Sequence, residues 1–257
     1  MTKDLSLALQ VAAKAAAGIR DQFERDFHTE EKSDYSLVTS VDRQAEAIII
    51  DELQKQSHHH ILSEERGRVP GSSGFTWVID PIDGTTNFSR RHVPFAVSIA
   101  LMDGDEPLVG VIHNPVSDER FYAEAGGGAF HNDKPIRVAD NDLPLHSIVF
   151  FNYGSKHEDR HTMVQVVDQL IYEFDLRIWG TTAWELCAVA KGTADAFVCV
   201  GDKLWDFAAG MCIIKEAGGQ FTDWHGDPWN ASHSYVLTAT PNIQPLLIER
   251  IRMFQQL

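Results

Sequence analysis

The segment 77–88 reads Trp77-Val78-Ile79-Asp80-Pro81-Ile82-Asp83-Gly84-Thr85-Thr86-Asn87-Phe88. It begins as an apolar run typical of a buried strand, ends in an acidic turn, and then opens a helix. Pro81 restricts the backbone between the carboxylates of Asp80 and Asp83, and Gly84 frees the backbone that follows. Carboxylates bind hard cations, and the free N–H groups of a helix start bind phosphate. The segment therefore predicts a site where magnesium and a phosphate ester meet.

The flanking sequence predicts mixed sheets layered with helices. Amphipathic helical spacing covers 5–27 and resumes after residue 42, and a short strand leads into Glu64 and Glu65. Strand patterns at 95–102, 108–113, 120–123 and 129–130 predict an antiparallel meander. From residue 147 onward, strands near 147–151, 177 and 194–200 alternate with helices near 158–174, 183–191, 205–217 and 243–254, and 224–229 reads as a hairpin turn. We expect one domain, 1–257, with an N-terminal α+β half of about 1–145 and a C-terminal α/β half of about 146–257.

Composition narrows the class of protein. The chain has 257 residues, of which 44% are hydrophobic and 23% charged, as in an ordinary globular protein. A formal net charge of −15 argues against a nucleic acid or an anionic membrane as the main partner. The cysteines, Cys187, Cys199 and Cys212, are odd in number and form no CxxC pair, which favours a reducing cytoplasm. No apolar run approaches the ~20 residues of a membrane span.

Four acidic segments each follow or open a regular element: Asp42, Glu64 with Glu65, Asp80 with Asp83, and Asp206. Each has an ordinary structural reading on its own, since Asp42 and Asp206 could cap helices and the glutamates could be solvated charges. Brought together, two carboxylates ~4 Å apart would repel by about 4 kcal/mol at an effective dielectric of ~20. Such a cluster requires bridging cations, and an all-oxygen set selects magnesium or manganese.

The order of these motifs resembles the inositol monophosphatase family of magnesium-dependent phosphatases. Glu-Glu is followed by Asp-Pro-Ile-Asp-Gly-Thr-Thr-Asn-Phe and then by Trp-Asp-x-Ala-Ala-Gly, and the resemblance runs from about Val38 to the C-terminus. It includes the glycine-rich turn 126–130 and the segment 180–182. The resemblance implies a layered αβαβα sandwich, a homodimer, inhibition by lithium, and two to three Mg²⁺ ions for which Mn²⁺ can substitute.

The resemblance also implies roles for individual residues. The metal ligands would be Glu64, Glu65, Asp80, the carbonyl of Ile82, Asp83 and Asp206. The catalytic group that positions and activates the attacking water would be Glu64, Thr85 and Asp42. The phosphate and substrate contacts would come from Asp83, Gly84, Thr85, Thr86, Gly180, Thr181 and Thr182.

The chain departs from the family pattern at one position. Members that prefer inositol phosphate carry a substrate-contacting glutamate seven residues before the last metal aspartate, and that position is Cys199 here. A thiol does not provide the strong charge-assisted hydrogen bonds that a carboxylate offers to a polyol. Asp202 could supply a replacement carboxylate and Lys203 could face a second phosphate, or both could be loop charges.

The sequence therefore predicts an enzyme that hydrolyses a small phosphate monoester with metal-activated water. The leading substrate is inositol monophosphate or a related sugar or polyol phosphate. The alternatives are 3′-phosphoadenosine 5′-phosphate, fructose 1,6-bisphosphate, histidinol phosphate and NADP. A different reading is a regulatory binding partner of the transcription machinery.

Overall fold

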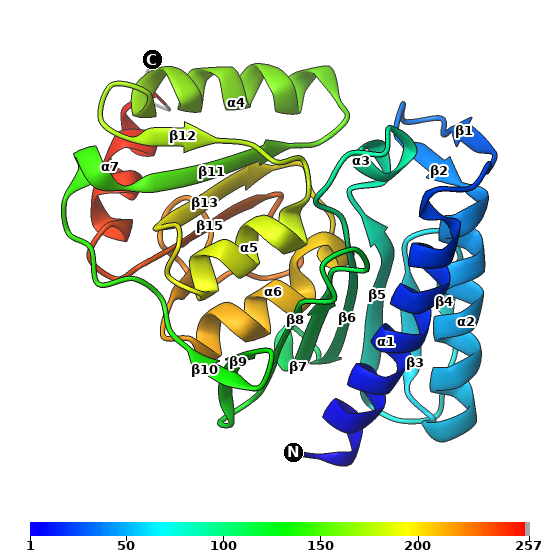
Figure 1. Cartoon of the computed structure of the whole chain (residues 1–257). Coiled ribbons are helices and arrows are strands. Elements are labelled where there is room, and N and C mark those ends of the chain that lie inside the picture. The colour runs from blue at the N-terminus through cyan, green and yellow to red at the C-terminus, as the bar shows by residue number, and fades with distance from the viewer. Residues whose placement is uncertain (255–257) are drawn as a thin grey trace.

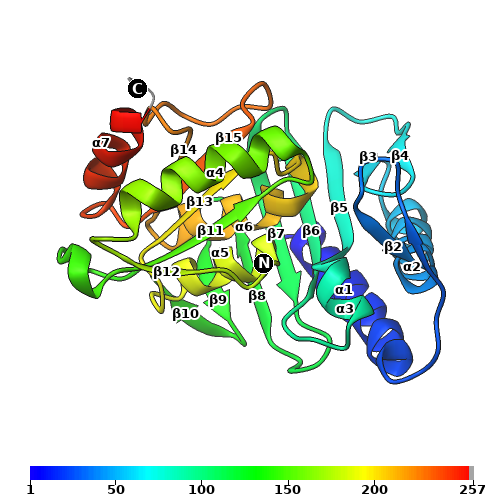
Figure 2. The same ribbon diagram turned by 90° about the horizontal axis from the view of Figure 1, so that it is seen from above.

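The computed structural model describes residues 1–254, which form alternating layers of helix and sheet. Across the molecule the order is helix, sheet, helix, sheet, helix (Figure 1). Figure 2 shows the same stack from above, with the N-terminal helices at one end and the C-terminal helix at the other. The predicted layered αβαβα sandwich is confirmed. Among the described residues, no helix combines the length and apolar character that crossing a membrane requires.

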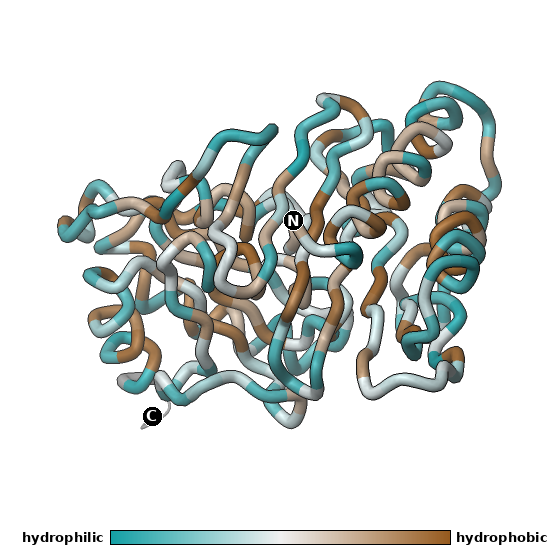
Figure 3. The backbone as a smooth tube through the Cα atoms, turned by 90° about the horizontal axis from the view of Figure 1, so that it is seen from below, coloured by the Kyte–Doolittle hydropathy of each residue, from teal (hydrophilic) through white to brown (hydrophobic). Residues whose placement is uncertain are grey.

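The first layer is a pair of amphipathic helices, α1 (Lys3–Phe23) and α2 (Ser40–Gln56). Figure 3 shows hydrophobic and hydrophilic segments alternating along the outer helices, as expected for helices with one buried face. The prediction that the first helix reaches residue 27 is wrong by one turn. The helix ends at Phe23, and the chain beyond it is held by other contacts. Phe27 stacks on Phe88 with ring centroids 4.8 Å apart, and Arg91 donates hydrogen bonds to the carbonyls of Phe23 and Arg25. Between α1 and α2 lies the short antiparallel pair β1 (Thr29–Glu31) and β2 (Leu37–Thr39), of which β1 was not predicted.

The second layer is an eight-stranded sheet in the order β10-β9-β8-β7-β6-β5-β3-β4. Its strands are β3 (His60–Ser63), β4 (Gly67–Val69), β5 (Thr76–Asp83), β6 (Ala96–Asp103), β7 (Glu106–His113), β8 (Arg120–Glu124), β9 (Gly128–His131) and β10 (Lys134–Ile136). The predicted meander is confirmed from β6 to β9. The edge strands β4 and β10 were missed, because each has three residues and becomes a strand only by pairing with its neighbour.

The C-terminal half supplies the other three layers. Its five-stranded sheet has the order β12-β11-β13-β15-β14. The strands are β11 (Ile148–Tyr153), β12 (Asp175–Arg177), β13 (Ala196–Val200), β14 (Gln220–Thr222) and β15 (Tyr235–Ala239). The 3₁₀ turn η1 (Pro144–His146) leads into it, and the helices are α4 (His157–Leu170), α5 (Thr182–Ala190), α6 (Leu204–Glu216) and α7 (Gln244–Phe254). Strands β14 and β15 were not predicted. The predicted turn between them is present, with Thr222 bridging to Pro228.

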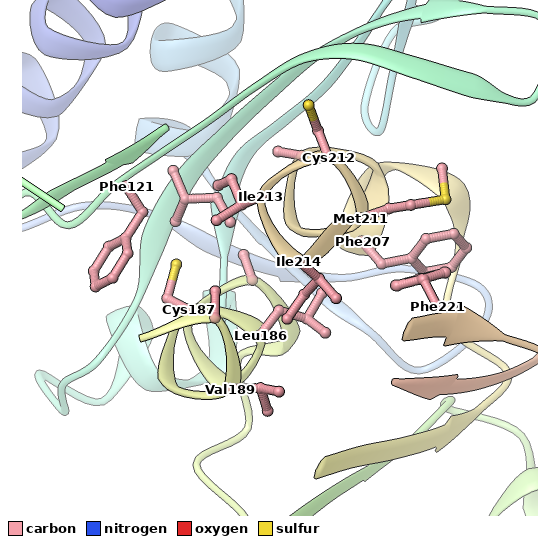
Figure 4. Close-up of a cluster of buried hydrophobic side chains, with 14 of the residues drawn as sticks. Phe121, Leu186, Cys187, Val189, Phe207, Met211, Cys212, Ile213, Ile214 and Phe221 are labelled. Atoms are coloured by element: carbon pink, nitrogen blue, oxygen red, sulfur yellow. The ribbon is translucent and has the colours of Figure 1, made fainter. Parts of the chain in front are cut away.

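The main core lies where α5 and α6 are held between the two sheets. Figure 4 shows Leu186 and Cys187 of α5, Met211, Cys212, Ile213 and Ile214 of α6, and Phe121 of β8 in this cluster. The two helices approach so closely that a Cβ on Gly210 would lie 2.3 Å from Leu186 Cδ1, which explains the need for glycine there. This central layer brings the start of α5 and α6 to the carboxyl end of β5, where the acidic residues gather.

Candidate active site

One cavity collects four of the acidic residues singled out in the sequence: Glu64, Asp80, Asp83 and Asp206. It has a volume of ≈ 230 Å³ and is lined by Ser36, Leu37, Glu64, Asp80, Ile82, Asp83, Gly84, Thr85, Thr86, Asn152, Tyr153, Gly180, Thr182, Asp202 and Asp206. A larger hollow of ≈ 550 Å³ lies over β3, β4 and β5, but Asp105 is the single carboxylate that lines it. We therefore place the chemistry in the smaller, acidic cavity.

Strand β5 delivers Asp80 and Asp83 to this cavity. Its register with β6 shifts between these two residues, at Pro81, so the strand is irregular at the point where both carboxylates face the site. Asp80 Oδ1 accepts the N–H of Ile82 at 3.0 Å. Asp83 Oδ2 accepts the Ala183 N–H at 2.9 Å and also the Thr181 hydroxyl, so Asp83 joins β5 to the start of α5 across the two halves.

Gly84 is required for the turn that follows. Its φ of 88° lies in the left-handed region, and a Cβ there would lie 3.2 Å from the Cβ of Thr181. The five-residue helix α3 (Thr85–Ser89) begins at the next residue. The predicted sequence of strand, acidic turn and helix is thus present, with the strand extending through the acidic turn.

Pairing between β3 and β5 brings Glu64 beside Asp80. The strands are parallel with Ser63 opposite Ile79, so the residues that follow each strand position lie next to each other. Lys32 Nζ lies 2.8 Å from Glu64 Oε1 and also contacts Glu65. Burial lowers the pKa of Lys32, but the charges and hydrogen bonds of the two glutamates outweigh it and raise that pKa above its usual range. Neither Glu64 nor Glu65 is therefore simply a solvated charge.

A buried glutamate that the sequence reading missed supports this acidic turn. Glu46 Oε1 accepts the N–H groups of Glu65 at 3.1 Å and Arg66 at 2.9 Å, together with the Ser63 hydroxyl. Glu46 lies one helical turn after Asp42 in α2, so the i, i+4 spacing on one helix face could have indicated it. Lys32, in contrast, stands in a polar stretch whose sequence carries no signal for its role.

Asp42 has both the structural role and the site contact that the sequence left as alternatives. Its Oδ2 accepts the N–H of Thr39 at 2.9 Å and the Thr39 hydroxyl, which closes a capping box at the start of α2. Its Oδ1 accepts the Thr85 hydroxyl at 3.0 Å. The same hydroxyl lies 3.0 Å from the Ile82 carbonyl, so Thr85 has two acceptors for its one proton.

Asp206 completes the cluster from a third segment. It sits in the first turn of α6, and its Oδ2 accepts the Lys203 N–H at 2.6 Å. Burial raises the pKa of Asp80 well above its ordinary value, and the charges of Glu64, Asp83 and Asp206 raise it further. Burial likewise raises the pKa of Asp83 to about 7. The carboxylates repel one another in a dehydrated site, which a bound cation would relieve.

The remaining sequence-predicted residues divide into those at the cavity and those outside it. Thr86, Gly180 and Thr182 line it. Thr181 and Cys199 do not, because their side chains are 1% and 0% exposed behind the wall, where Thr181 bonds to Asp83. Lys203 is exposed and absent from the lining. The substrate-binding set expected from the sequence includes Cys199 and Thr181, whose side chains lie behind the cavity wall in this structure, and their contact with substrate stays a prediction.

The donor set at the cavity fits a hard cation. Its acidic groups are carboxylates from β5, from the turn after β3, from α6 and from the loop before α6, and Ile82 lines the cavity beside them. Within residues 1–254, no three carboxylate, imidazole or thiolate groups already converge as a finished metal cage. Two of the contacts explain this: Lys32 holds Glu64, and Asp206 holds the backbone at the start of its own helix. Both residues line the cavity, so a bound cation would compete with these two contacts.

Comparisons with known proteins agree with this arrangement. A family model described as "Inositol monophosphatase family" matches residues 1–256. The chain is 36% identical to "Nus factor SuhB" of Pasteurella multocida, covering 98% of this chain and 97% of that protein, and 36% identical to "Inositol-1-monophosphatase" of Mesorhizobium japonicum, covering 96% and 97%. The crystal structure of the extragenic suppressor protein suhB of Bartonella henselae superimposes with a TM-score of 0.93 at 31% identity, covering 98% of this chain and 99% of that one.

These similarities identify the protein first as a phosphatase, a phosphoric monoester hydrolase. Within that class, the chain belongs to the inositol monophosphatase family. The family acts on small phosphate esters and is generally metal-dependent. The predicted family and enzyme class are confirmed.

Proposed function

We propose that this protein uses Mg²⁺ to hydrolyse a small phosphate monoester, most readily inositol monophosphate or a related sugar or polyol phosphate. One observation carries the proposal: Glu64, Asp80, Asp83 and Asp206, from three separate segments, line one cavity together with Thr85. Clustered carboxylates with raised pKa values are costly for folding unless the site binds cations. The similarity to a relative named inositol-1-monophosphatase supports the choice of substrate class.

Two to three Mg²⁺ ions would be held by Glu64, Glu65, Asp80, the Ile82 carbonyl, Asp83 and Asp206, and Mn²⁺ could substitute. When bound, the ions would lower the pKa of the attacking water and offset the charge on the phosphate and the leaving oxygen. The family resemblance supports inhibition by lithium and a homodimer as further parts of the proposal.

The chain's own residues would orient the attacking water. The Thr85 hydroxyl directs its proton toward Asp42 or the Ile82 carbonyl, each 3.0 Å away. Its oxygen can then accept a hydrogen bond from a water molecule in the cavity. Glu64, beside Asp80, would take up the proton that this water loses. Thr86 and the N–H groups of Gly84 and Thr85 lie at the start of α3, where a phosphate oxygen would bind.

The test is release of inorganic phosphate from a panel of esters, with and without Mg²⁺. The panel contains inositol 1-phosphate, 3′-phosphoadenosine 5′-phosphate, fructose 1,6-bisphosphate, histidinol phosphate, NADP and 4-nitrophenyl phosphate. Asp80→Asn and Asp206→Asn should abolish the Mg²⁺-dependent release while the circular dichroism spectrum stays native. Asp51→Asn, which makes the same charge change on the exposed face of α2, should retain full turnover. Normal turnover in either site variant would contradict the metal assignment.

A second candidate is a function by binding, which the similarity to "Nus factor SuhB" favours. The partner would then belong to the transcription machinery. Affinity capture with wild type and with Asp80→Asn would separate the two functions. A binding role independent of hydrolysis predicts the same partner on both proteins.

A further inference from the structure

The acidic cavity has a second polar wall that the proposed hydrolytic residues do not use. It is formed by Asn152 of β11, Thr182 at the start of α5, and Asp202 in the loop between β13 and α6. Asn152 Nδ2 donates to Thr182 Oγ1 at 2.9 Å, and Thr182 Oγ1 donates to Asp202 Oδ2 at 2.6 Å. These three residues form a directed hydrogen-bond chain, here called the 152–182–202 relay, that ends on a carboxylate.

The fold places the relay at the cavity for a topological reason. Strands β11 and β13 are parallel neighbours, with Asn152 opposite Cys199, so their carboxyl ends open at the same edge of the sheet. Asp202 follows that edge directly, and Thr182 arrives there because Asp83 fixes the start of α5. Ligands of open α/β sheets bind at this kind of edge.

The relay leaves Asp202 able to accept further hydrogen bonds. A carboxylate offers about four acceptor positions, of which Thr182 and the Cys199 thiol occupy two. Burial raises the pKa of Asp202 to about 6, against the opposing effect of those hydrogen bonds and of Lys203. In its ionised form the carboxylate accepts hydrogen bonds and donates none. Thr182 cannot offer its proton to a ligand, because that proton is committed to Asp202.

The charge of the cavity lining restricts what can face Asp202. The residues that line the cavity include no lysine and no arginine, and Lys203 lies outside it. A second phosphate placed against Asp202 would thus meet a like charge inside the cavity, while the cation of Lys203, which acts on Asp202, stands outside the lining. Hydroxyl groups, in contrast, would donate to the carboxylate, as the ribose hydroxyls of dinucleotides do to an acidic residue.

We propose that Asp202, held by the relay, is the specificity-determining residue that accepts hydrogen bonds from neighbouring hydroxyl groups of the substrate's alcohol half. The site then selects polyhydroxylated monophosphates and disfavours substrates that carry a second phosphate. Cys199, which stands where the family places its polyol-contacting glutamate, does not reach the cavity, and Asp202 takes over that task from a different position. The inference rests on the proposed phosphatase function and specifies its substrate class.

The test compares Asp202→Asn with wild type on three esters in the presence of Mg²⁺. Loss of a charge-assisted hydrogen bond is worth about 1.5–3 kcal/mol, so the KM for inositol 1-phosphate should rise by ~10-fold or more. The kcat for that ester should stay within about twofold, because the lost hydrogen bond stabilises the bound substrate and the transition state equally. The KM for 4-nitrophenyl phosphate, whose leaving group has no neighbouring hydroxyls, should not change. The KM for fructose 1,6-bisphosphate should fall. Asp51→Asn is the charge-matched control.

A second variant keeps the test decisive if Asp202→Asn does not fold. Thr182→Val removes the relay hydroxyl with little change in shape, and it should raise the KM for inositol 1-phosphate in the same direction but less. An equal change for inositol 1-phosphate and 4-nitrophenyl phosphate, or no change for the former, would overturn the role of Asp202. If wild type releases no phosphate from any ester with Mg²⁺, the proposed function itself fails, which is a distinguishable result.

Discussion

Asp42 has two roles, because it caps α2 and also accepts a hydrogen bond from Thr85. Replacing Asp42 by alanine removes both contacts, and comparison with Thr85→Ala separates the two roles. The side chain is 0% exposed, and Thr39, whose N–H it accepts at 2.9 Å, is 1% exposed. Loss of the reciprocal cap costs about 1 kcal/mol, and the stranded Thr39 N–H costs about 1–3 kcal/mol. Burial raises the pKa of Asp42, because the dehydrated carboxylate is itself unfavourable in the fold. Removing it offsets part of the cost, and we expect the free energy of unfolding to fall by about 2–3 kcal/mol.

The expected loss corresponds to a decrease in the melting temperature of about 4–12 °C, since 1 kcal/mol shifts a chain of this size by roughly 2–4 °C. Thermal unfolding followed by circular dichroism measures it. Thr85→Ala is the matched comparison. The two acceptors of the Thr85 hydroxyl keep other hydrogen-bond partners or face the solvated cavity when the hydroxyl is removed. The free energy of unfolding of this variant should therefore change by less than about 1 kcal/mol. Both variants should lower kcat on the ester that wild type hydrolyses best, because both remove the oriented hydroxyl.

The two variants also define what would refute the reasoning. If Asp42→Ala melts like wild type, the capping contacts carry no free energy. If Thr85→Ala is destabilised as much as Asp42→Ala, the Asp42–Thr85 contact is a structural one. If Thr85→Ala changes KM alone, the proposed role in positioning water is wrong.

Two further predictions concern other parts of the site. Glu185 is 0% exposed, and its Oε1 accepts the N–H groups of Trp179 at 2.6 Å and Gly180 at 3.1 Å. Glu185→Ala should therefore lower the melting temperature clearly, whereas Glu185→Gln, which keeps an acceptor and matches the neutral form that burial favours, should stay near wild type; equal effects would show that the acceptor is dispensable. The second prediction concerns pH: burial raises the pKa of Asp83 from 3.8 to about 7, so the folded protein binds the proton more tightly than the unfolded chain, and this group's stabilising effect declines as pH rises from about 4 to about 7. Because Mg²⁺ requires ionised carboxylates, the increase in melting temperature on adding Mg²⁺ should be larger at pH 8 than at pH 5.5, and a larger increase at pH 5.5 would contradict the assignment.

The part of the fold that sequence predicted correctly consists of elements with a strong local pattern. The helices α1 and α2 have an apolar face at helical spacing, α6 is a continuous apolar run, and β5 to β8 have apolar runs bounded by polar turns. The strands that were missed have little local pattern. β4 has three residues, Gly67–Val69, and is a strand only because β3 pairs with it, and β14 likewise depends on β15. Pairing partners lie elsewhere in the chain, so a local reading does not contain them.

The site shows the same division. The segment from Asp80 to Thr86 could be read from its own residues, because proline, glycine and paired carboxylates act on adjacent backbone. Lys32 and Asn152 could not, since they meet the site only after the layers stack, and Glu46 had only its i, i+4 spacing from Asp42 to indicate it. The sequence offered Asp202 as an alternative to Cys199. Only the burial of Cys199 and the hydrogen bonds of Asp202 in the folded protein favour Asp202.

By itself the sequence determined the kind of chemistry, because residues 77–88 carry two of the carboxylates proposed to bind metal, the turn and the start of the helix in one continuous segment. Tertiary structure decided which carboxylate faces the alcohol half of a substrate. That choice depends on β11 and β13 opening at one edge and on α5 delivering Thr182 to Asp202. Hydrogen bonds between distant segments exist only once those segments are packed, and they assign the cavity wall to Asp202 and the protein interior to Cys199.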